Sequence, residues 1–351
     1  MLSIVLLGMI VPSSVQAKKP INIFLGFIST EAGGSSYVPY GIAITPNSEV
    51  VYVAAKSPVF PYTGEVFAIN ALTDTIIAAI PMTGQSNTFG LAIDPKGEFL
   101  YVSNTGTTGT NGSVSVIRIA DNTVIATIGS PIIGPYPAWL AVSPDGKYLW
   151  LANSGTGTLF DNGTVTVIEL SDGNYTPVAL IPTGGSPTQP VFSPKGRRVY
   201  VLNQAGTGYI SVVNARTFNL DKPFFGLGLL INSYYSLSVN NYTVFVANQD
   251  ESVLKLSHQG ALENAYNMFL PNVTGTELGQ AVVKKNGEFL YVAESDVQSI
   301  GWVDLKTNTP ERLSPIEVGG SPVFLTIAPN DKMLYASDQD NDGIDVIDIK
   351  Q

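Results

Sequence analysis

The chain has 351 residues, of which 44% are hydrophobic and only 13% are charged, about half the charged fraction of an average globular protein. It carries 18 Lys and Arg against 28 Asp and Glu, for a formal net charge of −10, and it contains no cysteine. This composition excludes charge-driven disorder, disulfide bonds, thiolate metal sites and cysteine nucleophiles. Its acidity argues against a nucleic-acid partner.

The N-terminal 17 residues differ from the rest of the chain. Residues Leu2 to Val11 are apolar except for Ser3 and Gly8, and the small-residue end Val15-Gln16-Ala17 follows them. This pattern predicts a signal peptide over residues 1–17, although no Lys or Arg precedes the apolar stretch. A buried N-terminal strand or helix is the alternative. The stretch is shorter than the roughly 20 residues that span a bilayer, so we expect an exported protein without a membrane span, located in the periplasm, outside the cell or at the cell surface.

One pattern recurs seven times along the remaining chain: a short apolar strand, a turn, and an aromatic-aliphatic strand. Two copies read LAIDPKGEFLYVSN and LAVSPDGKYLWLAN. Each copy has an aromatic anchor in its second strand, and successive anchors lie 44 to 50 residues apart. The anchors are Tyr52, Tyr101, Trp150, Tyr200, Phe245, Tyr291 and Tyr335.

The second copy shows the four strands that we expect in each unit. They cover Leu91 to Ile93, Phe99 to Ser103, Ser113 to Arg118 and Thr123 to Ile128, with a Pro-Lys-Gly turn after the first. Four antiparallel strands in a unit of this length are typical of a propeller blade. The sequence therefore predicts an all-β, seven-bladed β-propeller that occupies residues 18–351 as a single domain.

The two ends of the chain complement each other. The seventh unit ends at Gln351 before a fourth strand, whereas Ile21 to Ile28 forms a strand-like segment with no unit of its own. We expect this N-terminal strand to complete the last blade and close the ring, which removes two exposed sheet edges. An open solenoid with loose ends is the alternative.

The repeats resemble the YVTN family of seven-bladed β-propellers. The resemblance rests on block starts of the form P-x-x-[IL]-A-[IV]-x-P-[DNK]-G, on the endings YVAA, YVSN, YLWLAN, YVLN and YVAE, and on the cores SVSVIR and TVTVIEL. It covers residues 20 to 351 and implies an exported or surface-layer-type prokaryotic propeller. The residues that carry it are structural, so it indicates a fold more than a function.

Catalytic motifs are scarce. His258 is the only histidine, which excludes multi-histidine metal sites, and we interpret it as a solvated turn residue. We interpret the basic cluster of Lys195, Arg197 and Arg198 in the same way, as a solvated turn. Some related propellers are lactonases of the phosphogluconolactonase type, and a hydrolase of that kind would need an acid or base in the central channel. Glu294 and Asp338, which end their strands, are the candidates.

Acidic residues gather in the connections between the second and third strands of the last units. The segment Asp338-Gln339-Asp340-Asn341-Asp342-Gly343 has the spacing of a Ca²⁺ loop built from oxygen ligands, with Asp338, Asp340 and Asp342 as ligands. Val346 and Ile349 stand where further acidic ligands are usual, so an ordinary acidic turn is the alternative. We expect no other cofactor.

The corresponding connections of the first three units are long and nearly uncharged, as binding loops on a rigid ring often are. They run from Lys56 to Gly64, from Thr105 to Gly112 and from Ser154 to Gly163. Their candidate binding residues are Phe60, Tyr62, Thr107, Asn111, Phe160 and Asp161. The leading hypothesis is a monomeric, non-enzymatic recognition or surface scaffold that binds a protein or carbohydrate through one face; the lactonase-type hydrolase is the alternative.

Overall fold

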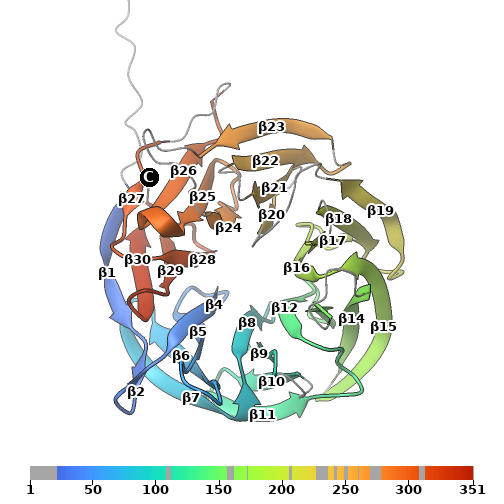
Figure 1. Ribbon diagram of the computed structural model, residues 1–351, viewed down its shortest axis with the longest axis horizontal. Helices are drawn as coiled ribbons and strands as arrows, with labels where there is room; N and C mark the ends of the chain where they lie inside the picture. The colour runs from blue at the N-terminus through green and yellow to red at the C-terminus, as the bar shows by residue number, and fades with distance from the viewer. Residues whose placement is uncertain are drawn as a thin grey trace, which may run out of the picture.

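The computed structural model describes residues 22–107, 112–155, 162–171, 173–204, 208–226, 236–240, 243–248, 252–259, 261–268, 278–307 and 313–350. Seven four-stranded antiparallel sheets stand around a central axis (Figure 1), which confirms the predicted propeller. We letter the strands of each blade a to d from the axis outward. Within the described residues, the only helix is a short 3₁₀ turn over Ser295–Val297, and no helix has the length and apolar character that crossing a membrane requires.

The first four blades follow one another in chain order, each with strands a to d in sequence. They consist of β4 (Val38–Ile44), β5 (Val50–Lys56), β6 (Thr63–Asn70) and β7 (Thr75–Ser86); β8 (Thr88–Ile93), β9 (Phe99–Asn104), β10 (Ser113–Arg118) and β11 (Thr123–Ile128); β12 (Pro137–Val142), β13 (Tyr148–Asn153), β14 (Asn162–Ser171) and β15 (Asn174–Gly185); and β16 (Pro187–Phe192), β17 (Arg198–Asn203), β18 (Tyr209–Asn214) and β19 (Leu220–Gly226).

The remaining three blades complete the ring, and the last of them takes its outer strand from the N-terminal part of the chain. They consist of β20 (Leu237–Val239), β21 (Thr243–Asn248), β22 (Ser252–Ser257) and β23 (Leu262–Asn267); β24 (Leu278–Val283), β25 (Phe289–Glu294), β26 (Ser299–Asp304) and β27 (Ile316–Glu317); and β28 (Pro322–Ile327), β29 (Met333–Asp338), β30 (Gly343–Asp348) and β1 (Ile23–Ser29). A small hairpin, β2 (Glu31–Ala32) and β3 (Ser35–Ser36), precedes the first blade.

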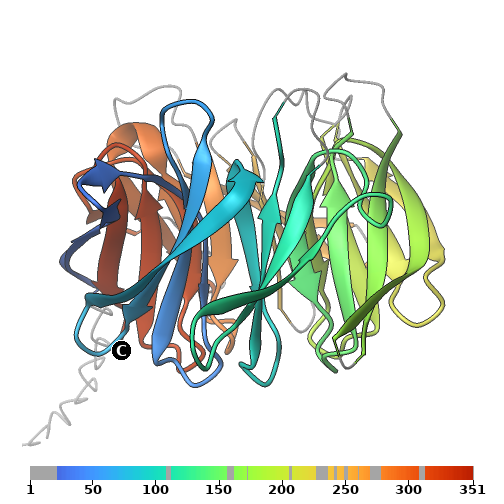
Figure 2. The ribbon, with the colours of Figure 1, turned by 90° about the horizontal axis from the view of Figure 1, so that it is seen from below.

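The strands run between two faces of the ring (Figure 2). We call the face that carries the b–c connections, such as residues 57–62, the loop face. The opposite face carries the a–b turns, such as residues 94–98, and the c–d turns; we call it the turn face. The b–c connections of the first three blades have six to eight residues, whereas the a–b turns have at most five.

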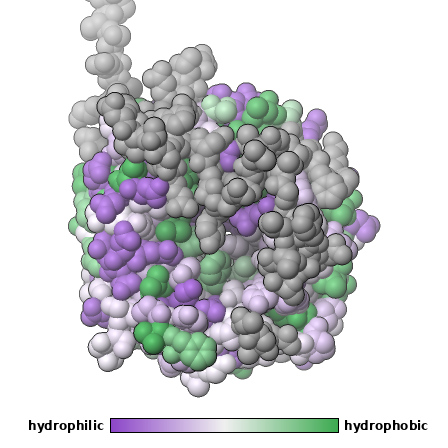
Figure 3. Space-filling view, in the orientation of Figure 1, coloured by the Kyte–Doolittle hydropathy of each residue, from purple (hydrophilic) through white to green (hydrophobic). Residues whose placement is uncertain are grey.

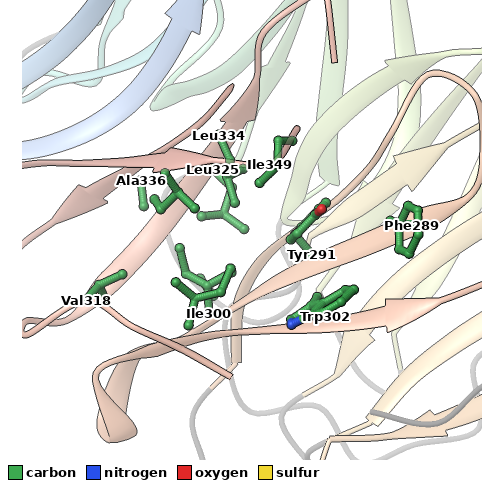
Figure 4. Packing of buried hydrophobic residues seen from close by; sticks show 12 residues of the cluster. Phe289, Tyr291, Ile300, Trp302, Val318, Leu325, Leu334, Ala336 and Ile349 are labelled. Atoms are coloured by element: carbon green, nitrogen blue, oxygen red, sulfur yellow. The ribbon is translucent and has the colours of Figure 1, made fainter. Parts of the chain in front are cut away.

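The aromatic anchors are the main packing elements between blades. All seven anchors are at most 3% exposed, and each packs against the next blade around the ring. Tyr52 of the first blade, for example, contacts Leu100 and Val102 of the second. Figure 4 shows the cluster in which Tyr291 and Trp302 of the sixth blade pack beside Leu325 and Leu334 of the seventh. Burial of these side chains holds neighbouring sheets face to face.

Ring closure occurs as predicted. β1 pairs antiparallel with β30, from Ile23 opposite Asp348 to Ser29 opposite Gly343. Thr30, which is fully buried, donates from its backbone nitrogen and its hydroxyl to the carbonyl oxygen of Asp342, both at 2.8 Å. Gly343 has no room for a side chain because the ring of Phe27 packs against it.

Some boundaries differ from the expected ones. The strand expected from Leu91 begins three residues earlier, at Thr88, because the chain continues along the channel wall before it pairs regularly. Gly33 and Gly34 form the tight turn of the β2–β3 hairpin, with φ values of 60° and 79°. The expected signal peptide, residues 1–17, lies outside the described residues.

Closure by β1 makes a mutational prediction. Ile28 is 8% exposed and packs with Phe67 and Tyr335, so Ile28→Ala should lower the free energy of unfolding by about 2–4 kcal/mol. Ile23, on the same strand but 50% exposed, provides the matched control, and Ile23→Ala should change stability by no more than about 0.5 kcal/mol. Urea denaturation measures both. Equal effects would show that β1 does not hold the last blade.

Candidate functional site

A ring of buried polar side chains marks the loop-face ends of the b strands. In six blades the last residue of strand b is polar and at most 4% exposed; the equivalent residue of the first blade is Ala55, one residue before the end of β5. The polar members are Asn104, Asn153, Asn203, Asn248, Glu294 and Asp338. Several of them bind hydroxyl groups of strand c: the Asn104 amide donates to Ser113 and Ser115, and the Asn153 amide donates to Thr164 and Thr166. The position thus serves to tie strands b and c together.

Glu294, one of the two candidate acids, belongs to this structural ring. Its side chain is fully buried, and the hydroxyl of Ser299 donates to its Oε2 atom at 2.6 Å. Gly301, which lies opposite Val292 on strand c, leaves the space that the carboxylate fills. Glu294 does not border the cavity described below.

Asp338, the second candidate acid, lies beside another buried acid that the sequence analysis did not single out, Asp345. Both are 0% exposed. The backbone nitrogens of Asp340 and Asn341 and the Asn341 amide donate to the Asp338 carboxylate, whereas both oxygens of Asp345 lack a hydrogen-bond partner among the described residues. Burial and the neighbouring Asp338 raise the pKa of Asp345 to about 8. Asp345 is therefore protonated at neutral pH.

The predicted calcium ligands do not converge. Asp338 faces Asn341 and Asp345, the Asp340 carboxylate accepts a hydrogen bond from the Ser321 hydroxyl at 2.6 Å, and Asp342 holds Thr30 through its backbone carbonyl. No group of three or more acidic, His or Cys side chains within the described part of the chain could hold a metal ion. Gly343, the last residue of the predicted calcium segment, is the first residue of β30. The calcium site stays a prediction on which nothing below depends.

The candidate binding loops are described in part. Phe60 is 73% exposed and Tyr62 is 37% exposed, and their rings meet edge to face with centroids 5.9 Å apart on the loop face. Thr107 is half-buried in the second b–c connection. Asn111, Phe160 and Asp161 lie outside the described residues. The structure thus joins Phe60 and Tyr62 in one exposed aromatic pair.

A cluster of aromatic rings that the sequence analysis missed occupies one side of the central channel. Tyr40, Phe89, Trp139 and Phe324 come from the a strands of the first, second, third and seventh blades. Trp139 is 5.2 Å from Phe89 and 5.0 Å from Phe324, centroid to centroid, and Phe89 is 5.3 Å from Tyr40. The Lys56 ammonium lies 4.5 Å from the centroid of the Tyr40 ring.

Beside this aromatic cluster lies a cavity of about 160 Å³. Its wall combines three of these aromatic rings with amide and hydroxyl side chains, most of which come from other blades. It is lined by Phe89, Ala138, Trp139, Ser154, Thr188, Gln189, Gln204, Ser236, Gly279, Gln280, Val323 and Phe324. Ser154 and Gln204 directly follow strands b, so the cavity lies toward the loop face. Figure 3 views the molecule from this face. None of these lining residues is acidic or basic.

Two of the lining glutamines also join blades. Gln189 Oε1 accepts a hydrogen bond from the backbone nitrogen of Leu237 at 3.0 Å, and Gln280 Oε1 accepts one from Leu325 at 2.8 Å. These bonds satisfy backbone groups on strand edges that face the channel. The amide nitrogens of Gln189 and Gln280 and the whole side-chain amide of Gln204 have no partner among the described residues, so they are available to a ligand.

The channel cavity could have been predicted by comparing the repeats with one another. The position before the first regularly paired residue of strand a lies on the innermost strand of its blade. At this position the chain has Trp139, Gln189, Gln280 and Phe324 in four blades. Comparison of the repeats at that one position would have shown aromatic and amide residues together.

The buried acid pair makes a prediction for stability against pH. The pKa of Asp345 is raised in the folded state, so the folded protein binds a proton that the unfolded chain releases above its ordinary pKa of 3.8. Stability should therefore fall as pH rises from about 4 to above 8. Asp345→Asn should remove this part of the pH dependence and raise the free energy of unfolding at pH 8 by roughly 2–4 kcal/mol. Urea denaturation between pH 5 and 9 measures this. The control is Asp348→Asn, at the partly exposed last residue of the same strand. An unchanged pH profile in Asp345→Asn would contradict the assignment.

Comparisons with known proteins agree with this architecture. Residues 42–161, roughly a third of the chain, match a family model described as "Lactonase, 7-bladed beta-propeller". No curated protein sequence matches the chain.

Solved structures with the same fold have unrelated descriptions. Kuenenia stuttgartiensis hydrazine synthase aligns with a TM-score of 0.74 at 16% identity, over 93% of this chain and 100% of that chain. The Cps50 (Swd1) β-propeller domain of Myceliophteria thermophila aligns with a TM-score of 0.72 at 11% identity, over 94% and 100% of the two chains. U3-55K aligns with a TM-score of 0.73 at 11% identity, over 92% and 98%. The chain is a seven-bladed β-propeller, and its first blades are similar to the lactonase family model.

Proposed function

We propose that this protein is a recognition propeller that binds a neutral, polar ligand with an apolar face, of the carbohydrate class, in the channel cavity on the loop face. The observation that carries the proposal is the composition of the cavity wall: aromatic rings on one side, free amide groups on the other, and no charged residue among those that line it.

A sugar ring suits such a wall for physical reasons. Its C–H groups form an apolar patch that packs on an aromatic face, while its hydroxyl groups donate to and accept from amides. Trp139 and Phe89 provide the aromatic surface, and Gln204 provides both a donor and an acceptor. A charged ligand would lose its hydration here without gaining an opposite charge.

The same wall argues against hydrolysis in this cavity. Lactone hydrolysis needs a general base, an activated water or a comparable charged group at the reacting carbon. The described lining contains no carboxylate, imidazole, Lys or Arg side chain. Of the two candidate acids, Glu294 is enclosed with Ser299, and Asp338 is held by Asn341.

The loop face is also suited to larger partners. The exposed pair of Phe60 and Tyr62, together with Val59 at 69% exposure, places apolar side chains on a connection that projects from the ring. We propose that the chain works outside the cytoplasm, as the N-terminal sequence pattern indicates, with a glycan or a glycan-bearing protein as its partner. Export is tested by locating the mature chain in cell fractions and determining its first residue.

Trp139 provides a direct readout of ligand binding. We expect neutral mono- to trisaccharides from a panel to change the tryptophan fluorescence of the wild-type chain, and Trp139→Phe to remove that change. Gln204→Met should weaken binding about 3- to 10-fold, because the variant loses hydrogen bonds worth roughly 0.5–1.5 kcal/mol while keeping its volume.

Gln259, an exposed glutamine in a turn on the opposite face, provides the matched control. Gln259→Met should bind as the wild type does. A complete absence of binding across a glycan array, or equal losses in both glutamine variants, would contradict the proposal.

The lactonase-type hydrolase remains a second candidate because the family model matches residues 42–161. Turnover of a panel of lactones by the wild-type chain, lost in Glu294→Gln or Asp338→Asn while the fold is retained, would favour it. From the burial of both carboxylates, we expect no turnover above the rate in buffer. Circular dichroism confirms that each variant folds.

A further inference from the structure

A second cavity lies between the fourth and fifth blades on the turn face, across the ring from the loop face. It has a volume of about 450 Å³. Its wall contains Ser193, Pro194, Lys195, Arg197, Arg198, Asn214, Asp221 and His258. The structure thus brings together the basic cluster and the lone histidine, which the sequence analysis treated as separate solvated turns.

The repeat shows that Arg198 is unusual at its position. Arg198 is the first residue of strand b, where the first, second, third, sixth and seventh blades have an apolar or aromatic residue. Those residues are Val50, Phe99, Tyr148, Phe289 and Met333. The preceding residue, Arg197, is matched by glutamate in three blades, Glu49, Glu98 and Glu288, and by lysine in two, Lys147 and Lys332. The departure of the fourth blade is therefore Arg198, a second basic residue where five other blades have an apolar or aromatic one.

His258 is just as unusual at its own position. It directly follows strand c, and in the six other blades the residue after the corresponding strand segment is apolar. These residues are Ala71, Ile119, Leu170, Ala215, Leu305 and Ile349. A structural requirement of the blade would favour an apolar side chain here, so the imidazole is not needed for the fold.

The imidazole is oriented by its surroundings. The backbone carbonyl of Asn240 accepts a hydrogen bond from it, and its ring packs edge to face on Tyr200, with centroids 5.6 Å apart. Its Nε2 atom is buried and has no hydrogen-bond partner among the described residues. A buried ring nitrogen without a partner is costly unless something binds it.

The charges around the cavity favour an anion. Lys195 and Arg197 form no ion pair within the described residues, and Arg198 Nε lies 3.4 Å from Asp221 Oδ2. Asp221 thus offsets one of the three cations and leaves two. Glu263, on β23, is ion-paired with Lys255 at 3.3 Å. On a chain of net charge −10, this is a local concentration of unpaired positive charge.

We propose that this cavity is a binding site for a tetrahedral oxyanion, the phosphate or sulfate group of a small molecule. Lys195, Arg197 and Arg198 supply the positive charge, and His258 Nε2 contacts one oxygen of the group. Guanidinium and ammonium groups are the usual partners of such oxyanions. The site is separate from the channel cavity and does not depend on the function proposed for it.

The protonation of His258 follows from its neighbours. Burial lowers the pKa of His258, and Arg198 lowers it further, while the hydrogen bond to Asn240 and the charge of Glu263 oppose these effects. The imidazole is therefore neutral at pH 7 in the free protein. A bound dianion adjacent to Nε2 favours the protonated form, so binding should raise the pKa.

Because His258 is the only histidine, its NMR signal needs no assignment by mutagenesis. We would follow the imidazole Cε1–H signal of the full chain through a pH titration, with and without saturating inorganic phosphate at constant ionic strength. We expect phosphate to raise the pKa of His258 by about one unit, which corresponds to roughly tenfold tighter binding to the protonated form. Sodium sulfate should also raise it.

The double variant Lys195→Gln/Arg197→Gln should lose the phosphate-dependent shift and keep the melting temperature of the wild type, because both side chains are exposed. The matched control is Lys96→Gln/Lys147→Gln, which removes two lysines from the equivalent turns of the second and third blades; it should keep the shift. An equal shift with sodium chloride, a shift that persists in the Lys195→Gln/Arg197→Gln variant, or no shift with either oxyanion would overturn the proposal.

Discussion

The structure depends on the insertion of one aromatic side chain per blade into the neighbouring blade. Each anchor lies in strand b, is almost fully buried, and contacts the sheet that follows it around the ring. A four-stranded sheet cannot bury both faces alone, so each blade needs the one before it and the one after it. The last contact, between Tyr335 and the first blade, also includes Ile28 of β1. Ring closure is thus a packing requirement as well as a matter of strand pairing.

This arrangement leaves the innermost strand of every blade with a free edge in the channel. Side chains from neighbouring blades satisfy part of that edge: Gln189 and Gln280 accept from backbone nitrogens, and the Gln339 amide donates to the carbonyl of Pro39 at 3.0 Å. Some polar residues in the channel are therefore structural. The channel side chains that make no such bond are available to a ligand. They are chiefly Gln204 and the aromatic surface of Trp139.

The repeat also provides an internal reference for function. Where all blades share a residue type, the fold explains it, as it explains the buried polar residues at the ends of strands b. Where one blade departs from the others, the fold gives no reason for the change. Arg198 and His258 depart in this sense at neighbouring positions of adjacent blades, and they meet at one cavity. Glu294 and Asp338 do not depart, since both occupy a position that is polar and buried in most blades.

The sequence by itself determined the number of blades, the aromatic anchors and the closing strand, because these follow from a local pattern repeated at a regular spacing. Strands such as Ser113–Arg118 and Thr123–Ile128 were predicted to the residue, since alternation and turn chemistry are local properties. Only the tertiary structure decided which side chains share a cavity. Trp139 and Phe324 are far apart in the chain and meet because the ring brings the third and seventh blades to one channel. Arg198 and His258 are likewise separated by a whole unit, and no local pattern relates a turn of one blade to a turn of the next.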